Sequence, residues 1–112
     1  MGYYLEINSL EGCPYSQEVN ALVKSHNINA NINRISYNEK HLYKNNIIST
    51  FPQVYLKKYN SAGSVLLGGN SDFKEILSMN NKTLDLQLKL LSNKYKNISK
   101  KTQLRIIELF LK

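Results

Sequence analysis

The residues of this chain best suited to covalent chemistry lie in one short stretch, Cys13-Pro14-Tyr15-Ser16. Cys13 is the only cysteine among the 112 residues, so it cannot form a disulfide within the chain. A cysteine attacks disulfides as the thiolate, and a helix N-terminus favours the thiolate through its unpaired N–H groups and the positive end of its dipole. Pro14 suits a first helical turn, and apolar residues follow at helical spacing over 19–23. The stretch therefore predicts a nucleophilic cysteine at the start of a helix.

The segments around this cysteine alternate between strand and helix patterns. Aromatic and aliphatic residues at 3–7 predict a strand that ends before Cys13, and alternating apolar and polar residues predict a second strand at 30–35. Helical spacing predicts a helix at 39–48, and two β-rich runs joined by turn residues predict a hairpin. The hairpin runs are 52–57 and 64–67, and further helices are predicted from 72, over 83–91 and over 99–111.

This order of elements predicts an α/β fold of the thioredoxin-like type. We expect a central four-stranded mixed sheet flanked by helices, with an extra helix at the C-terminus. A chain of 112 residues is long enough for one hydrophobic core and too short for two full ones. We therefore interpret residues 1–92 as one domain and residues 93–112 as a basic helical extension packed on or beside it.

The net charge of +7 is concentrated near the C-terminus. Residues 1–81 contain seven Lys and Arg against six Asp and Glu, whereas residues 82–112 contain eight against two. An acidic protein or a nucleic acid would bind this basic tail. The solvated face of a helix explains the same charge and is the favoured interpretation, because no aromatic residues are interleaved there to stack on bases.

Composition also limits which cellular compartment and which kinds of site are expected. No apolar run approaches the roughly 20 residues that a membrane span requires, so we expect neither a membrane segment nor a signal peptide. A single cysteine is typical of a reducing compartment, and we expect a cytoplasmic protein. His26 and His41 have no Asp, Glu or Cys at ligand spacing, so no metal site is expected.

Three motifs together resemble the glutaredoxin family. Cys13-Pro14-Tyr15-Ser16 is similar to the glutaredoxin active site CPYC with its second cysteine replaced, as in monothiol glutaredoxins. Thr50-Phe51-Pro52-Gln53-Val54-Tyr55 resembles the family's T-V-P-x-[VI]-F segment, whose proline is cis and faces the cysteine. Gly68-Gly69-Asn70-Ser71-Asp72 resembles its G-G-x-x-D turn. The three motifs stand in the family's order, and the resemblance covers about residues 3–91.

The resemblance also implies roles for individual residues. Cys13 is the expected catalytic residue, with Tyr15 beside the thiol. Phe51 and Pro52 are expected to hold the cysteinyl part of glutathione. The γ-glutamyl end is expected near Ser71, with the Asp72 carboxylate facing its ammonium group. The implied glutathione-binding residues are thus Tyr15, Phe51, Pro52, Ser71 and Asp72, and the remaining motif positions are Pro14, Ser16, Gly68 and Gly69.

Two positions depart from the family pattern. Many glutaredoxins have a lysine three residues before the cysteine, where it binds glutathione and stabilises the thiolate. Here that position is Leu10, and the neighbouring Glu11 opposes thiolate formation. By approximate alignment, Lys44 is a candidate cation for the glycyl carboxylate of glutathione, with an ordinary solvated lysine as the alternative.

The implied function is a glutathione-dependent thiol–disulfide oxidoreductase that reduces glutathione mixed disulfides by a monothiol mechanism. Because Ser16 stands where a second cysteine would resolve the disulfide on Cys13, an outside thiol must resolve it, and glutathione is the expected co-substrate. The expected partners are glutathionylated or disulfide-containing proteins. Two alternatives stay open: a monothiol glutaredoxin that carries a [2Fe-2S] cluster, and a non-catalytic thioredoxin-fold docking module.

Overall fold

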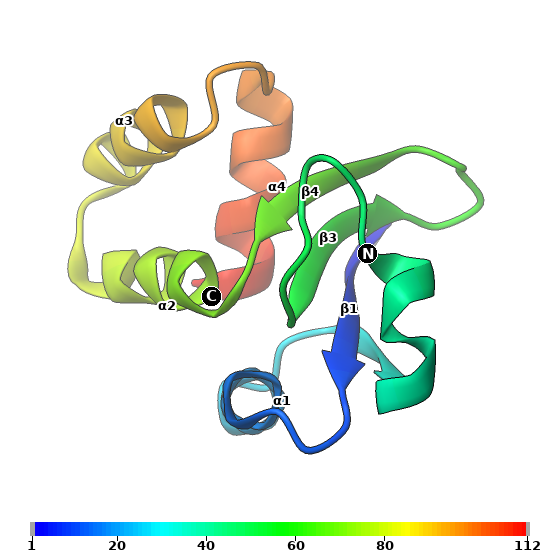
Figure 1. Ribbon diagram of the computed structural model, residues 1–112. Helices are drawn as coiled ribbons and strands as arrows, with labels where there is room; N and C mark the ends of the chain where they lie inside the picture. The colour runs from blue at the N-terminus through cyan, green and yellow to red at the C-terminus, as the bar shows by residue number, and fades with distance from the viewer. Residues whose placement is uncertain (1, 112) are drawn as a thin grey trace.

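A four-stranded mixed sheet forms the centre of the computed structural model, which describes residues 2–111. The strands lie in the order β2-β1-β3-β4 (Figure 1). Their bounds are β1 Tyr3–Leu10, β2 Ala30–Ile35, β3 Gln53–Lys58 and β4 Ser64–Gly68. The helices are α1 Pro14–Ser25, α2 Asn70–Leu77, α3 Leu84–Lys94 and α4 Lys100–Phe110, with short 3-10 segments η1 Tyr37–Tyr43 and η2 Ser78–Asn81. The predicted α/β fold with a four-stranded mixed sheet is confirmed.

The strand register brings the sequence motifs to one end of the sheet. β1 pairs with β2 in parallel, from Leu5 opposite Ala30 to Leu10 opposite Ile35. β3 is antiparallel to β1, with Asn8 opposite Gln53, so the segment that enters β3 lies beside the segment that leaves β1. β1 runs to Leu10, beyond the predicted 3–7, because its last residues continue the pairing with β2.

Alternate residues of the strands build the hydrophobic core on one face of the sheet. Leu5 and Ile7 of β1 are fully buried and belong to one cluster with residues of α1, α2, α3 and α4. The rings of Phe73 in α2 and Phe110 in α4 lie 5.1 Å apart between their centroids. Each such side chain contributes about 1.5–3 kcal/mol when it is fully buried. The last helix therefore contributes directly to the core that holds the sheet and α2 together.

The opposite face of the sheet carries polar residues, and η1 and the loop after it lie on this side (Figure 1). The prediction of a helix at 39–48 is wrong, because the 3-10 segment ends at Tyr43. Leu42 and Ile47 are 68% and 83% exposed, so their helical spacing has no apolar surface to pack against. The Asn45 side chain also accepts hydrogen bonds from the N–H groups of Ile47 and Ile48, at 2.8 and 2.9 Å, and thus favours a turn over a helix.

The remaining helices begin at residues with clear capping roles. Thr83 precedes α3, and its side chain accepts a hydrogen bond from the N–H of Leu86. Ser99 precedes α4 and accepts one from Thr102 in the same way. Within residues 2–111, none of the helices combines the length and the hydrophobicity that crossing a bilayer would require.

Candidate functional site

Cys13 is the residue immediately before α1, in the connection that leaves β1. It has an extended backbone, and its carbonyl accepts the Gln17 N–H at 3.0 Å, which starts the helix. Its own N–H donates to the carbonyl of Leu10 at 3.2 Å, closing a tight turn in which Gly12 has a φ of 76°. That left-handed conformation favours glycine. The thiol is free and half-buried, and it lies at the N-terminus of α1.

The Cys13 thiol faces the segment that enters β3. Its Sγ lies 3.9 Å from the carbonyl oxygen of Phe51. The Phe51–Pro52 peptide bond is cis, as the resemblance implies, and both residues are buried. Antiparallel pairing of β1 with β3 brings this segment across from Cys13. The structure therefore brings together the first two motifs, which are nearly forty residues apart in the chain.

Ser16, which stands in place of a second cysteine, has a structural role that sequence reasoning missed. It is fully buried, and its Oγ accepts a hydrogen bond from the N–H of Leu10 at 3.1 Å. Leu10 in turn supplies the carbonyl that holds the Cys13 N–H. The Ser16 hydroxyl thus stabilises the turn that contains Cys13. A serine on the first turn of a helix gives no signal in the sequence that its hydroxyl points back to the preceding strand.

The Gly68–Asp72 turn joins β4 to α2 and lies next to the Phe51–Pro52 segment. Gly68 has a φ of 120°, and a Cβ there would lie 2.0 Å from Asp72 Oδ2, so glycine is required. Gly69 precedes α2, and its N–H donates to Asp72 Oδ2 at 2.9 Å. A Cβ at Gly69 would lie 3.4 Å from the carbonyl oxygen of Pro52. The third motif is therefore packed against the second.

The Asp72 carboxylate is already paired with a lysine of the chain. Lys94, the last residue of α3, places its Nζ 2.7 Å from Asp72 Oδ1 and 2.9 Å from Glu75 Oε1. Burial raises the pKa of Asp72, but hydrogen bonds from Lys94 and from the Gly69 N–H outweigh it, so the pKa lies below its ordinary value. Burial lowers the pKa of Lys94, and the bonds to Asp72 and Glu75 raise it above its ordinary value. In the sequence, Lys94 was one basic residue among several in the tail.

A cleft of about 500 Å³ contains four of the five residues predicted to bind glutathione. Tyr15, Phe51, Ser71 and Asp72 line it, whereas Pro52 is buried and is not part of the lining. The other lining residues are Ile47, Ile48, Thr50, Leu66, Gly68, Gly69 and Asn70. Cys13 does not line the cleft, but its thiol faces the carbonyl oxygen of Phe51, which does.

The cleft is closed at one side by contacts between the starts of α1 and α2. The Asn70 side-chain amide donates to the carbonyl of Tyr15 at 3.1 Å and to Glu18 Oε1 at 2.8 Å. Lys74 Nζ lies 3.3 Å from Glu18 Oε2. The pKa of Glu18 lies below its ordinary value, chiefly because of the hydrogen bond from Asn70 and next because of the contact with Lys74. These contacts join the start of α1, which carries Tyr15, to the start of α2.

Charge in the cleft is sparse. Among the described residues that line it, Asp72 has the only charged side chain, so neither Lys44 nor Glu11 is part of the lining. Lys44 instead directly follows η1, and Glu11 is exposed in the turn before Cys13. The candidate cation for a glycyl carboxylate is therefore not brought to the cleft wall.

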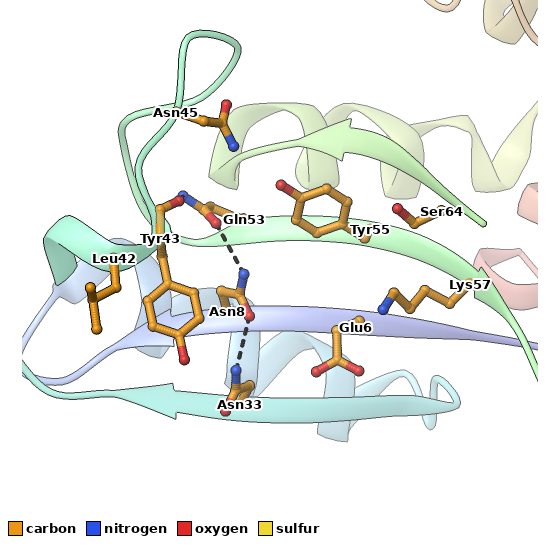
Figure 2. A pocket seen from close by; sticks show the side chains of 10 residues that line it. All are labelled: Glu6, Asn8, Asn33, Leu42, Tyr43, Asn45, Gln53, Tyr55, Lys57 and Ser64. Atoms are coloured by element: carbon orange, nitrogen blue, oxygen red, sulfur yellow. Dashed lines mark hydrogen bonds between the residues drawn. The ribbon is translucent and has the colours of Figure 1, made fainter. Parts of the chain in front are cut away.

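A second hollow, of about 530 Å³, lies on the polar face of the sheet and contains none of the predicted site residues (Figure 2). Side-chain amides form a chain across three strands: Asn33 donates to Asn8 at 3.2 Å, and Asn8 donates to Gln53 at 3.0 Å. Gln53 then donates to the carbonyl of Tyr43 at 2.8 Å. This chain of amides ties the η1 segment to the sheet and explains why polar residues occupy alternate positions of β1, β2 and β3.

The cleft therefore lies next to the Cys13 sulfur, which faces the Phe51 carbonyl, and its lining includes the Asp72 carboxylate that is paired with Lys94. Such an arrangement suits an extended ligand with a sulfur at one end and a polar group at the other. Comparison of the chain with family models, curated proteins and solved structures gives no significant match.

Proposed function

We propose that this chain is a glutathione-dependent thiol–disulfide oxidoreductase of the glutaredoxin type, acting on glutathione mixed disulfides through Cys13 alone. The observation that carries the proposal is the position of the Cys13 sulfur. It stands at the N-terminus of α1, 3.9 Å from the Phe51 carbonyl and next to a cleft that holds four of the five expected ligand-binding residues. The agreement of three separate motifs in one place supports the assignment.

The proposed reaction has two exchanges. The Cys13 thiolate attacks the glutathionyl sulfur of a mixed disulfide, so a bond forms between Cys13 and glutathione, and the partner leaves as a thiolate that takes a proton from water. The thiolate of a second glutathione then attacks the bound glutathionyl sulfur and releases glutathione disulfide. Cys13 returns to the thiolate, and in sum one free glutathione thiol converts the mixed disulfide into the partner's thiol and glutathione disulfide.

The role proposed for Ser16 follows from its contacts. Its side chain is buried and bonded to the Leu10 N–H, and it has no thiol with which to attack the disulfide on Cys13. The mixed disulfide with glutathione therefore persists until a second glutathione reaches it. Glutathione is accordingly a co-substrate, and the protein partner is released in the first exchange.

Intact mass spectrometry and a turnover assay test the proposal together. Incubation with glutathione disulfide is expected to add one glutathionyl group to the wild-type protein and none to Cys13→Ser. The wild type is then expected to catalyse glutathione-dependent reduction of a glutathionylated peptide, and Cys13→Ser is expected to show no activity above the uncatalysed rate.

Other outcomes of the same experiment separate the alternatives. Absence of both the adduct and turnover would refute the oxidoreductase and leave the docking module. A visible absorption band after anaerobic cluster assembly with glutathione, without turnover, would favour [2Fe-2S] carriage. Both results would contradict the proposal in its present form.

A further inference from the structure

We propose that Lys94 is a specificity-determining residue of the cleft. By pairing with Asp72, Lys94 takes the place of a ligand ammonium group. The protein therefore discriminates only weakly between disulfide substrates with and without an amino group at this end. The inference rests on the proposed function, because it concerns the ligand held between Cys13 and Asp72. It assigns to the C-terminal part of the chain a direct influence on the ligand.

Both oxygens of the Asp72 carboxylate are occupied by partners within the chain. Lys94 Nζ lies 2.7 Å from Oδ1, and the Gly69 N–H donates to Oδ2 at 2.9 Å. Glu75 also contacts the ammonium, with its Oε1 2.9 Å away, but its side chain is 56% exposed and is not part of the cleft lining. An incoming cation at Asp72 would thus find both carboxylate oxygens occupied, and a charge that Lys94, shared with Glu75, partly balances.

Lys94 is held in place more firmly than a surface lysine. Its side chain is only 14% exposed, and it ends α3 where the helix is anchored by the buried Leu91. The next residue, Tyr95, is hydrogen-bonded through its hydroxyl to the carbonyl of Leu67, one residue before Gly68. Lys94 and the residue after it therefore contact both ends of the turn from Gly68 to Asp72.

The charges facing the cleft make this contact decisive for selection. Among the described residues that line the cleft, only Asp72 is charged, so it is the one carboxylate available to a ligand ammonium. A second ammonium placed beside it is attracted by Asp72 and repelled by Lys94, so the net attraction is much weaker than that of an unpaired carboxylate. Glu75 is 56% exposed, and its attraction is screened by solvent. A ligand end without an amino group loses little in comparison.

The test compares two substrates that differ only in this amino group. One is a peptide mixed disulfide with glutathione, and the other is the same peptide carrying the des-amino analogue, in which a glutaryl group replaces γ-glutamyl. For the wild type we expect kcat/KM values within roughly threefold of each other, since the net charge contribution is small. For Lys94→Met we expect a preference of roughly tenfold for glutathione, the discrimination that one charged hydrogen bond supplies.

Lys96→Met is the matched control, because Lys96 is exposed, two residues away, and removes the same charge from the tail. It is expected to keep the wild-type ratio. Circular dichroism and thermal melting show whether Lys94→Met is folded, and Lys94→Gln replaces it where it is not. The wild-type ratio also tests the inference without any substitution.

The possible failures are distinguishable. If the wild type turns over neither substrate, the proposed function fails and the inference fails with it. If the wild type turns over glutathione and already prefers it tenfold or more to the analogue, the function stands and the inference is overturned. The same conclusion follows if the ratio is equal in the wild type and in a folded Lys94 variant.

Discussion

Replacement of Ser16 by alanine tests whether the buried hydroxyl fastens the cysteine turn. Ser16 is 0% exposed, and its Oγ accepts the Leu10 N–H at 3.1 Å. Alanine removes the acceptor and leaves this N–H without a partner inside the protein, which costs about 1–3 kcal/mol for a buried group. Because Leu10 is half-buried, some water reaches the N–H, and we expect the free energy of unfolding to fall by about 1–2 kcal/mol.

The assay is thermal and urea unfolding followed by circular dichroism. A loss of this size lowers the melting temperature of a domain of this length by roughly 5–10 °C. Ser25→Ala is the matched control on the same helix, because Ser25 is exposed and its hydroxyl bonds only to the Leu22 carbonyl and the His26 ring. It is expected to change stability by less than about 0.5 kcal/mol. Equal melting temperatures for the two variants would refute the role assigned to the Ser16 hydroxyl.

Three further predictions concern the same cleft. Ser16→Cys places a second thiol on the first turn of α1, so intact mass after glutathione disulfide treatment is expected to show loss of the glutathionyl adduct in favour of an internal disulfide with Cys13. Gly68→Ala forces a Cβ to within 2.0 Å of Asp72 Oδ2 at a φ of 120°, and is expected to lower stability by more than about 1 kcal/mol in urea unfolding, whereas Gly63→Ala, with its nearest atom 3.8 Å away, is not. Because its partners hold the pKa of Asp72 below the ordinary value, its contribution to stability is complete above about pH 4 and is lost as the pH falls through the lowered value. Asp72→Asn is expected to flatten that part of a stability–pH curve, and an unchanged curve would contradict the pairing with Lys94.

The local patterns that were strong in the sequence correspond to elements that pack on one face of the sheet. Pro14 and the apolar spacing after it predict α1, and the alternation at 30–35 predicts β2, because both patterns match the core that receives them. The prediction of a helix at 39–48 was wrong because its apolar residues have no core to pack against. Leu42 and Ile47 have helical spacing, but both are exposed: Leu42 borders the polar hollow of the sheet and Ile47 lines the cleft. Periodicity cannot show what lies opposite a side chain.

The sequence by itself determined the strand–helix order, the cysteine before a helix and the three motifs that predict a single site. Their types and spacing follow from local chemistry: a thiol next to a proline, a proline at a strand entry, and glycines where the backbone has positive φ. Only the tertiary structure decided what these residues contact. The Ser16 hydroxyl meets Leu10, and Lys94 meets Asp72 from a distant helix. Such pairings depend on how α1 lies against β1 and how α3 lies against α2, because a hydroxyl or an ammonium on a helix has no sequence signal for the partner it meets across space.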